Sequence, residues 1–352
     1  MQGAPIQTTD DWTATFDTII DCRSPAEFER DHIPAAVNCW SLNNNQRQLV
    51  GVVYKQDGAF AGRRLGAGLV SANIARHLAT TLADKPKQWC PLIYCWRGGQ
   101  RSGAMATVLS QIGYRVTVLE RGYKAYRNCV LNRLPQLCVL PKFVVLSGRT
   151  GVGKTRVLKA LAEQGEQILD LEDLACHRGS LFGGLGLAAQ PSPPYFDSLL
   201  YDALRRLDFS RPVWTEAESA KIGALHLPQP LVANMRKAPS VHLKATLASR
   251  VETIMSDYID AQIASNTVRA LLAKLPIRIS KEQRFAMEQQ AQAGDWRGLA
   301  TALIQWHYDP SYRRSTTSNF IGLQLGEVNV NARDFTAAAQ KCQSLLVAEN
   351  FG

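Results

Sequence analysis

The stretch KFVVLSGRTGVGKTRVLKALAEQG, residues 142–165, decides the fold of the second half of the chain. Its first seven residues form an apolar run typical of a buried β-strand, and its last ten have the pattern of a helix closed by Gly165. Between them, GRTGVGKT (148–155) satisfies G-x-x-x-x-G-K-[ST] in the strand–loop–helix context that a phosphate-binding loop requires. The stretch therefore predicts an α/β domain that binds a phosphorylated ligand.

The side chains of this loop indicate how phosphates would be held. Backbone N–H groups would wrap a diphosphate or triphosphate, Lys154 would reach terminal phosphate oxygens, and Thr155 could hold Mg²⁺. The pattern does not choose the ligand, because ATP, GTP or a prenyl diphosphate fits it equally. The predicted phosphate-binding residues are Gly148, Arg149, Thr150, Gly151, Val152, Gly153, Lys154 and Thr155.

Two segments that follow the loop carry further candidates. VWTEAES (213–219) ends a predicted strand on acids, so Glu216 or Glu218 is a candidate Walker B-type partner; two solvated glutamates would give the same pattern. The Gly/Pro-rich segment after residue 175 is either a loop that contacts the substrate or a surface Ω-loop. Its candidate substrate-loop residues are His177, Arg178, Gly179 and Ser180.

A cysteine loop marks the first half of the chain. IYCWRGGQRSG (93–103) places Cys95 at the end of a predicted strand and before a predicted helix. A thiolate there would face backbone N–H groups and the positive end of the helix dipole, which should lower the thiol pKa. A buried cysteine before an ordinary helix is the alternative. The predicted anion-binding residues beside Cys95 are Arg97, Gly98, Gly99, Gln100, Arg101 and Ser102.

Strands alternate with helices on both sides of a central boundary, which predicts two parallel α/β sheets. In the first half, the predicted strands are 16–21, 36–40, 91–95 and 115–120; in the second, 142–148, 167–171, 211–216 and 240–245. We expect an N-terminal domain at 1–133, a linker at 134–141, a P-loop α/β domain at 142–265 and a helical C-terminal region at 266–352.

Composition narrows the class of protein. The chain has 352 residues with a net charge of +10, which suits a polyanionic partner such as nucleic acid or small phosphorylated ligands. WHYDPSYRR (306–314) combines aromatic and basic residues as single-stranded RNA sites do, although a helix-packing cluster is an equal alternative. Eight scattered cysteines without a C-x-x-C pair, no signal peptide and no apolar run of membrane-spanning length predict a cytoplasmic protein without a membrane.

The first half resembles the rhodanese family over roughly residues 10–130. The resemblance rests on DCRSPAEFERDHIPAAVN (21–38) and on the cysteine loop that follows a strand about 55 residues later. It implies a rhodanese-like parallel sheet flanked by helices and a persulfide-type intermediate on Cys95, with sulfur or selenium as the outer atom. Cys95 to Arg101 also spells C-x₅-R, the phosphate loop of rhodanese-fold phosphatases, so chalcogen transfer and phosphate chemistry both stay open.

The order of YCWRGGQRSG, SGRTGVGKT, HRGSLFGGLG and VWTEAES resembles the tRNA 2-selenouridine synthase family over nearly the whole chain. This resemblance implies a transferase that first geranylates 2-thiouridine, at the wobble position of tRNAs for Lys, Glu and Gln, with geranyl diphosphate. Selenium from selenophosphate then replaces the geranylated sulfur. No tightly bound cofactor is implied, and a selenophosphate-producing enzyme is a possible partner.

The same resemblance assigns roles to residues. Cys95 would accept selenium as a selanyl-cysteine, Arg97 and Arg101 would hold selenophosphate, and Lys154 and Arg149 would offset the charge of the diphosphate leaving group. Two alternatives remain. One is an ATP-dependent sulfurtransferase that acts on tRNA or a cofactor through a Cys95 persulfide; the other is a phosphate sensor attached to a nucleotide-switched RNA-binding module.

Overall fold

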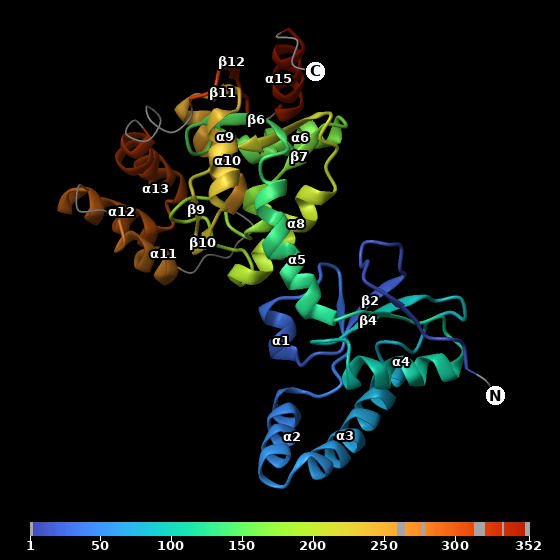
Figure 1. Ribbon diagram of the computed structural model, residues 1–352. Helices are drawn as coiled ribbons and strands as arrows, with labels where there is room; N and C mark the ends of the chain where they lie inside the picture. The colour runs from blue at the N-terminus through green and yellow to red at the C-terminus, as the bar shows by residue number, and fades with distance from the viewer. Residues whose placement is uncertain (1–2, 259–264, 276–278, 313–320, 333, 349–352) are drawn as a thin grey trace. The chain divides into compact units, whose positions relative to one another are not determined.

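The computed structural model describes residues 3–258, 265–275, 279–312, 321–332 and 334–348 (Figure 1). The chain forms two compact units. The first unit comprises residues 1–134 together with 192–202, and the second comprises 135–191 together with 203–352. Residues 192–202 therefore belong to the first unit, although both flanking segments belong to the second.

The first unit is built on a five-stranded sheet with the order β1-β5-β4-β2-β3, in which all neighbouring strands are parallel. Its strands are β1 (Gln7–Thr9), β2 (Thr18–Asp21), β3 (Val37–Asn38), β4 (Pro91–Tyr94) and β5 (Thr117–Leu119). Every residue of β4 is buried, as expected for a central strand of a parallel sheet covered on both faces. The predicted parallel α/β architecture of the first half is confirmed, and β1 is a strand that the sequence analysis did not predict.

Helices connect these strands. They are α1 (Pro25–Arg30), α2 (Asn44–Gln56), α3 (Ala59–Ala79), α4 (Gln100–Ile112) and α5 (Gly122–Leu137). Met105 and Leu109 of α4 pack with Ile20 and Ile93 of the sheet in one hydrophobic core. The predicted linker, 134–141, begins inside α5, which runs to Leu137.

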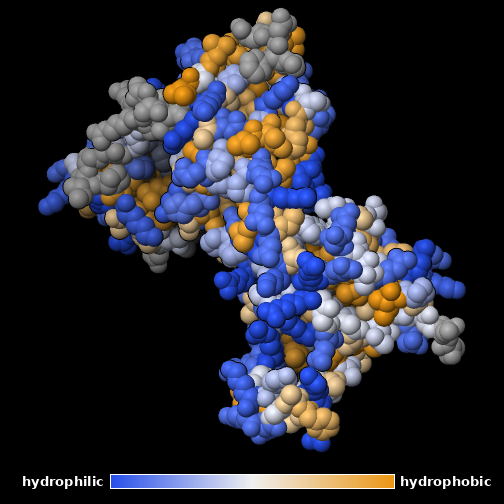
Figure 2. Space-filling model, in the orientation of Figure 1, coloured by the Kyte–Doolittle hydropathy of each residue, from blue (hydrophilic) through white to orange (hydrophobic). Residues whose placement is uncertain are grey.

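Helices α2 and α3 form a hairpin, and the sequence analysis did not predict α2. Asn43 and Gln46 form a capping box at its start. The helices approach closely at Gly62, where a Cβ would lie 2.8 Å from the Tyr54 Cα. None of the residues of α2 is buried, and Figure 2 shows the hairpin surface as a mixture of hydrophilic and hydrophobic residues.

The second unit contains a five-stranded parallel sheet with the order β12-β11-β6-β8-β7. The strands are β6 (Lys142–Gly148), β7 (Gln167–Leu169), β8 (Pro212–Glu216), β11 (Ser240–Lys244) and β12 (Gln324–Asn329), and β9 (Lys221–Ile222) pairs with β10 (Leu225–His226) in a small hairpin. Its helices in this part of the chain are α6 (Lys154–Glu163), α7 (Leu171–Leu174), α8 (Pro193–Arg205) and α9 (Gln229–Lys237), of which α8 lies largely in the first unit. The four strands predicted for this half all appear.

The C-terminal part is mainly helical, as predicted, but it also contributes β12 to the edge of the sheet. Its helices are α10 (Leu247–Tyr258), α11 (Ser265–Leu272), α12 (Lys281–Ala293), α13 (Trp296–Ala302), a π-helical turn (Leu303–Tyr308) and α15 (Phe335–Ala348). Arg313 and Arg314 of the predicted aromatic–basic patch lie outside the described residues. In the part of the chain that the structure describes, no helix has the length and apolar character needed to cross a membrane.

Candidate functional sites: a cysteine loop and a phosphate loop

Cys95 follows β4 directly and lies at the start of α4, where the sequence analysis placed it. Its Sγ accepts a hydrogen bond from the Gly99 N–H at 3.2 Å and lies 3.1 Å from the Ser102 Oγ. The side chain is 3% exposed. The strand end, the Gly-rich turn and the first turn of α4 therefore surround this sulfur with hydrogen-bond donors.

This environment favours the thiolate. Burial raises the pKa of Cys95, but hydrogen bonds from Ser102 and Gly99 and the charge of Arg101 outweigh burial and hold the pKa below its ordinary value. By contrast, burial raises the pKa of Cys39 to about 11 and that of Cys342 to about 12. Cys95 is thus buried and yet has a stabilised thiolate, and a stabilised thiolate is what nucleophilic cysteines require.

The backbone of the cysteine loop is held by the first turn of α5. The Cys95 carbonyl accepts a hydrogen bond from the Tyr123 N–H at 2.8 Å, and the Trp96 carbonyl accepts one from the Lys124 N–H at 3.0 Å. Gly122 has a φ of +53°, and a Cβ there would lie 2.1 Å from the Cys95 oxygen. Only glycine fits this approach. The sequence analysis missed Gly122; its signal was a glycine two residues after the strand predicted at 115–120.

The two predicted arginines of the loop have different surroundings. Arg101 donates to the Glu27 Oε2 at 2.9 Å, and Arg47 contacts the same oxygen at 3.2 Å. Burial raises the pKa of Glu27, but the charge of Arg101 and the hydrogen bond from the Ser24 N–H have the larger combined effect. The pKa of Glu27 therefore lies below its ordinary value, and the carboxylate stays ionised. Arg97 is exposed. Part of the positive charge predicted beside Cys95 is therefore balanced by Glu27.

The short segment 192–202 completes a buried polar network of the first unit. The carboxylate of Asp31 accepts hydrogen bonds from Tyr123 Oη at 2.6 Å and from Ser198 Oγ at 2.7 Å. Arg127 donates to Asp197 at 2.6 Å, and the His32 ring stacks on Tyr195 with centroids 4.0 Å apart. Tyr123 links this network to the cysteine loop, because its N–H donates to the Cys95 carbonyl and its hydroxyl donates to Asp31.

In the second unit, the phosphate loop joins β6 to α6. Gly148, Gly151 and Gly153 all have positive φ, at 150°, 82° and 87°. A Cβ on Gly153 would lie 2.4 Å from the Phe335 ring, so glycine is required there for space as well as for backbone conformation. Lys154 Nζ donates to the Gly148 carbonyl at 3.2 Å and thus lies across the loop.

An arginine of α10 anchors the loop. The guanidinium of Arg250, which is 4% exposed, donates to the Thr150 carbonyl at 2.9 Å and to both carboxylate oxygens of Asp309 at 2.7 and 3.0 Å. Arg149 also pairs with Asp309, at 3.2 Å. A bound phosphate would therefore compete with Asp309 for the Arg149 guanidinium.

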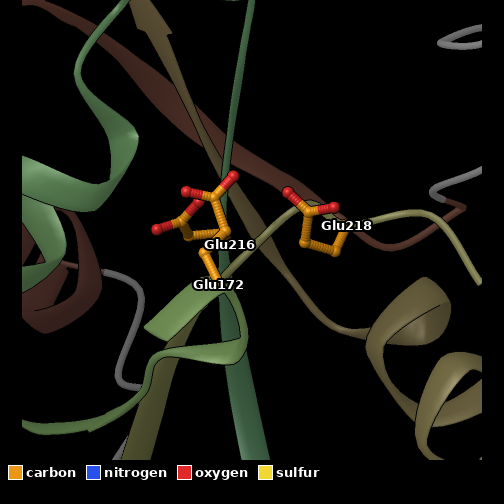
Figure 3. A group of neighbouring side chains, drawn as sticks. All are labelled: Glu172, Glu216 and Glu218. Atoms are coloured by element: carbon orange, nitrogen blue, oxygen red, sulfur yellow. The ribbon is translucent and has the colours of Figure 1, made fainter. Parts of the chain in front are cut away.

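Three glutamates gather at the carboxyl edge of the sheet, beside the phosphate loop. Glu216 ends β8, Glu218 follows it, and Glu172 lies in α7 just after β7. Each offers one carboxylate oxygen, and these three oxygens lie within 4.8 Å of one another (Figure 3). Thr155 Oγ1 donates to Glu172 at 3.0 Å. The structure brings both predicted acids together with Thr155, and it adds Glu172, which sequence reasoning missed although it follows a predicted strand.

Glu216 is the buried member of this cluster, whereas Glu172 and Glu218 are half-buried. Glu216 is 1% exposed, and neither of its carboxylate oxygens has a hydrogen-bond partner. Burial, followed by the charges of Glu216 and Glu218, raises the pKa of Glu172 to about 9. Burial also raises the pKa of Glu216 to about 8, although Lys154 opposes this. Carboxylate oxygens are the ligands that Mg²⁺ prefers, so the residues present suit a divalent cation.

The predicted substrate loop packs against these acids. Gly179 has a φ of +64°, and a Cβ there would lie 2.7 Å from Glu172 Oε1 and 2.8 Å from Glu218 Oε1. His177 N–H donates to the Glu172 carbonyl at 3.0 Å. The following residues turn back on themselves: Ser180 N–H donates to the Arg178 carbonyl, and the Arg178 guanidinium donates to a later carbonyl of the loop. The segment therefore packs its backbone against the acid cluster at Gly179, where a side chain would not fit.

Comparisons with known proteins cover both units. A family model described as "Rhodanese-like domain" matches residues 7–129, and one described as "tRNA 2-selenouridine synthase AAA domain" matches residues 141–273. Curated proteins named tRNA 2-selenouridine synthase are also similar to this chain. The one from Nitrosomonas europaea is 35% identical over 80% of this chain and 75% of its own length.

The relative from Sulfurovum sp. is 38% identical over 68% of this chain and 66% of its own length, and the one from Marinobacter nauticus is 34% identical over 86% and 90%. The similarity thus extends across both units and both loops rather than over one domain alone. The chain belongs to the family of enzymes named tRNA 2-selenouridine synthase.

Proposed function

We propose that this enzyme is a transferase that makes 2-selenouridine in tRNA in two steps: geranylation of 2-thiouridine at the wobble position, then replacement of the sulfur by selenium. The observation that carries the proposal is the thiolate-stabilising cradle of Cys95, in a chain that also holds a complete phosphate loop. Each loop lies at the carboxyl edge of a parallel sheet and at a helix N-terminus, which is where anions bind.

The phosphate loop suits the geranyl step. The sulfur of 2-thiouridine attacks C1 of geranyl diphosphate, the C1–O bond breaks, and the diphosphate leaves while the base loses its N3 proton. The loop N–H groups and Lys154 would stabilise the charge that develops on the leaving group. A divalent cation near Thr155 would add Lewis-acid stabilisation there. No ATP hydrolysis is needed, because the diphosphate itself provides the leaving group.

The cysteine loop suits the selenium step. Selenium at the oxidation level of selenide adds to C2 of the geranylated base, geranylthiol leaves, and water releases phosphate from selenophosphate, so the exchange is redox-neutral. Alkylation matters because a thiol is a better leaving group than an unalkylated sulfur. We assign Cys95 as the catalytic thiolate of this step, with Arg97 and the N–H groups of residues 98–102 as the selenophosphate site.

The proposed RNA substrate is consistent with the charge of the chain. Phosphate contacts dominate the affinity of RNA-binding proteins, and the net charge of +10 supplies the required sign. We propose the tRNAs for Lys, Glu and Gln as substrates, no tightly bound cofactor, and a selenophosphate-producing enzyme as the source of the donor.

The test is mass spectrometry of wobble uridines in 2-thiouridine-containing tRNA incubated with the enzyme, geranyl diphosphate and selenophosphate. We expect 2-selenouridine with the unsubstituted enzyme, only the geranylated base with Cys95→Ala, and neither product with Lys154→Ala. Ser110→Ala is the matched control, because Ser110 lies on α4, the helix that follows the cysteine loop. This variant should behave like the unsubstituted enzyme.

One alternative gives a different result in the same assay. An ATP-dependent sulfurtransferase would form no geranylated base with any donor, and tRNA would stimulate its turnover of ATP. That combination would overturn the proposal and leave Cys95 as a persulfide carrier.

A further inference from the structure

Three cysteines stand side by side at the carboxyl edge of the first unit's sheet. Cys39, Cys22 and Cys95 directly follow β3, β2 and β4, which are neighbours in that sheet. Asp21 is in register with Tyr94 on one side and with Asn38 on the other. The Cys22 N–H donates to the Tyr94 carbonyl at 2.8 Å, and the Cys39 N–H donates to the Asp21 carbonyl at 3.0 Å. The next residue of each strand therefore joins one row, in the order Cys39, Cys22, Cys95.

The side chains of Cys22 and Cys95 lie on the same face of the sheet. Ile20 is in register with Ile93, and both isoleucines pack in the same hydrophobic core as the two cysteines. Side chains alternate between the two faces along a strand, so a residue two positions later returns to the same face. Cys22 and Cys95 are each two positions after their isoleucine, and their side chains therefore adjoin.

The spacing of the strands decides which thiols can bond. Neighbouring strands lie about 4.8 Å apart, and the two Cα atoms of a disulfide usually lie about 4.4–6.8 Å apart. Cys22 and Cys95, on neighbouring strands, meet this condition. Cys39 is two strand spacings from Cys95, or roughly 9.6 Å, which is too far. Of the other two thiols in the row, Cys22 is thus the one within reach of Cys95.

The two neighbouring thiols differ in reactivity. Hydrogen bonds and the charge of Arg101 stabilise the Cys95 thiolate, as described above. Cys22 is 0% exposed, and burial, followed by the charges of Cys95 and Asp21, raises its pKa well above the ordinary value. Cys22 therefore stays protonated while Cys95 reacts. A cysteine of low pKa beside a second thiol is the arrangement from which oxidation proceeds to a disulfide.

We propose that Cys22 is the resolving thiol of Cys95, and that hydrogen peroxide converts the pair into a Cys22–Cys95 disulfide. The Cys95 thiolate attacks one peroxide oxygen and the O–O bond breaks. Cys95 is thereby oxidised to a sulfenic acid, and the departing hydroxide takes a proton from solvent. The Cys22 sulfur then attacks the Cys95 sulfur, the S–O bond breaks, and the hydroxyl leaves as water with the Cys22 proton. The peroxide is reduced to two water molecules.

The first step prepares the second. The protonated sulfenic acid carries no charge, so the repulsion from the Cys95 anion that raises the pKa of Cys22 is absent once Cys95 has been oxidised. The disulfide also limits the damage. Further peroxide turns a sulfenic acid into a sulfinic acid, which thiols do not reduce, whereas a disulfide is reopened by thiol exchange. The modification needs only the two thiols and peroxide, so it is independent of the proposed geranyl and selenium steps.

The experiment treats the reduced full-length protein with hydrogen peroxide at pH 7, without tRNA or donors. Free thiols are then blocked with N-ethylmaleimide, and tryptic peptides are analysed by mass spectrometry. Trypsin cleaves between Cys22 and Cys95, so their disulfide appears as a linked peptide pair; fragmentation separates Cys95 from Cys90, which shares its peptide. The test variant is Cys22→Ala. Cys39→Ala is the matched control, because Cys39 is an equally buried cysteine of the same row beyond reach of Cys95.

We expect the Cys22–Cys95 link in the unsubstituted protein and in Cys39→Ala, and its complete loss on treatment with dithiothreitol. In Cys22→Ala the link should be absent, dimedone should label Cys95 as a sulfenic acid, and sulfinic acid should accumulate there. Thermal unfolding of each reduced variant checks that it is folded. Accumulation of sulfinic acid on Cys95 of the unsubstituted protein without a link to Cys22 would overturn the inference. A link from Cys95 to Cys39 or Cys90 in place of Cys22 would do the same.

Discussion

At the scale of single residues, Cys95 and Glu216 are both buried ionisable groups, but their surroundings differ. Cys95 is surrounded by donors that stabilise its anion, whereas the Glu216 oxygens lack a hydrogen-bond partner and lie beside two other carboxylates, with Lys154 as the nearby cation. The chemistry of Cys95 could be read from the sequence because cysteine, glycines and helix start are consecutive. The cluster around Glu216 could be read only in part, since Glu172 comes from a segment more than forty residues away.

The first prediction concerns Ser102. Replacing it with alanine removes a hydrogen bond to the Cys95 sulfur, so the pKa of the thiol should rise and the thiolate fraction at neutral pH should fall. Hydrogen bonds to charged groups are worth about 1.5–3 kcal/mol, so alkylation of Cys95 by iodoacetamide at pH 7 should slow by at least about tenfold. The pH–rate profile of alkylation, followed by peptide mass spectrometry, checks this.

Ser110→Ala is the control for Ser102, because Ser110 lies on the same helix but bonds to the Ala4 carbonyl. Its alkylation profile should match that of the unsubstituted protein. An unchanged profile in Ser102→Ala would show that Ser102 does not stabilise the thiolate.

A second prediction concerns Gly122. Alanine there would place a Cβ 2.1 Å from the Cys95 carbonyl and would require a positive φ, so the cysteine loop must move. We expect a lower melting temperature and loss of the enhanced reactivity of Cys95. Gly103→Ala in α4 is the matched control, because nothing lies within 4 Å of its Cβ position and alanine is the better helix former. Equal melting temperatures for the two variants would contradict the close approach.

At the scale of elements, the predictable parts are those whose signals are local. β6, the phosphate loop and α6 follow one another in the chain, and their pattern identified them directly. β12 was not predicted, because only Leu325 and Val328 of its six residues are buried and its partner β11 is about 80 residues away. The α2 helix was missed because its apolar residues are confined to one run, 49–54, instead of recurring at helical spacing along its length.

A third prediction tests how α10 holds the phosphate loop. Arg250→Met leaves Asp309 without its bidentate partner and the Thr150 carbonyl without a donor. The cost should reach about 3 kcal/mol, the lower end for a buried pair because Asp309 is partly exposed. We expect the melting temperature of the second unit to fall by roughly 6–12 °C and the affinity for inorganic pyrophosphate to decrease. Calorimetry measures both.

Lys244→Met is the control for Arg250. Lys244 pairs with Glu327 on an exposed surface of the same unit, where ion pairs contribute little to stability. Its melting temperature and pyrophosphate affinity should stay close to those of the unsubstituted protein. A matching result for Arg250→Met would mean that the loop holds its conformation without α10.

At the scale of the whole molecule, the sequence identified two α/β halves but not how the chain is shared between them. The change of pattern predicts a boundary near residue 134; the N-terminal segment of the first unit runs to Leu134, and the unit also includes residues 192–202. Residues 192–202 could not be assigned to that unit from sequence, because their contacts with Asp31, Arg127 and His32 depend on polar side chains without periodicity.

The fourth prediction follows from the assignment of residues 192–202 to the first unit. The isolated segment 1–134 lacks Ser198 and Asp197, so the Asp31 carboxylate loses a hydrogen-bond donor and Arg127 loses its ion pair with Asp197. We expect it to unfold at a lower temperature than the same unit within the full chain, and a peptide of residues 190–206 added in excess should raise its melting temperature. Thermal unfolding followed by circular dichroism checks both statements. A peptide with Ser198→Ala and Asp197→Asn serves as the control and should give less stabilisation.

The placement of residues 192–202 also sets an order of events during synthesis. A ribosome that adds about 5–20 residues per second completes residue 202 roughly 3–14 s after residue 134. Throughout that interval all five strands of the first unit's sheet have been translated, whereas Ser198 and Asp197, the partners of Asp31 and Arg127, have not. The cysteine loop can therefore gain this support only after the phosphate loop has been translated, although the cysteine loop is encoded first.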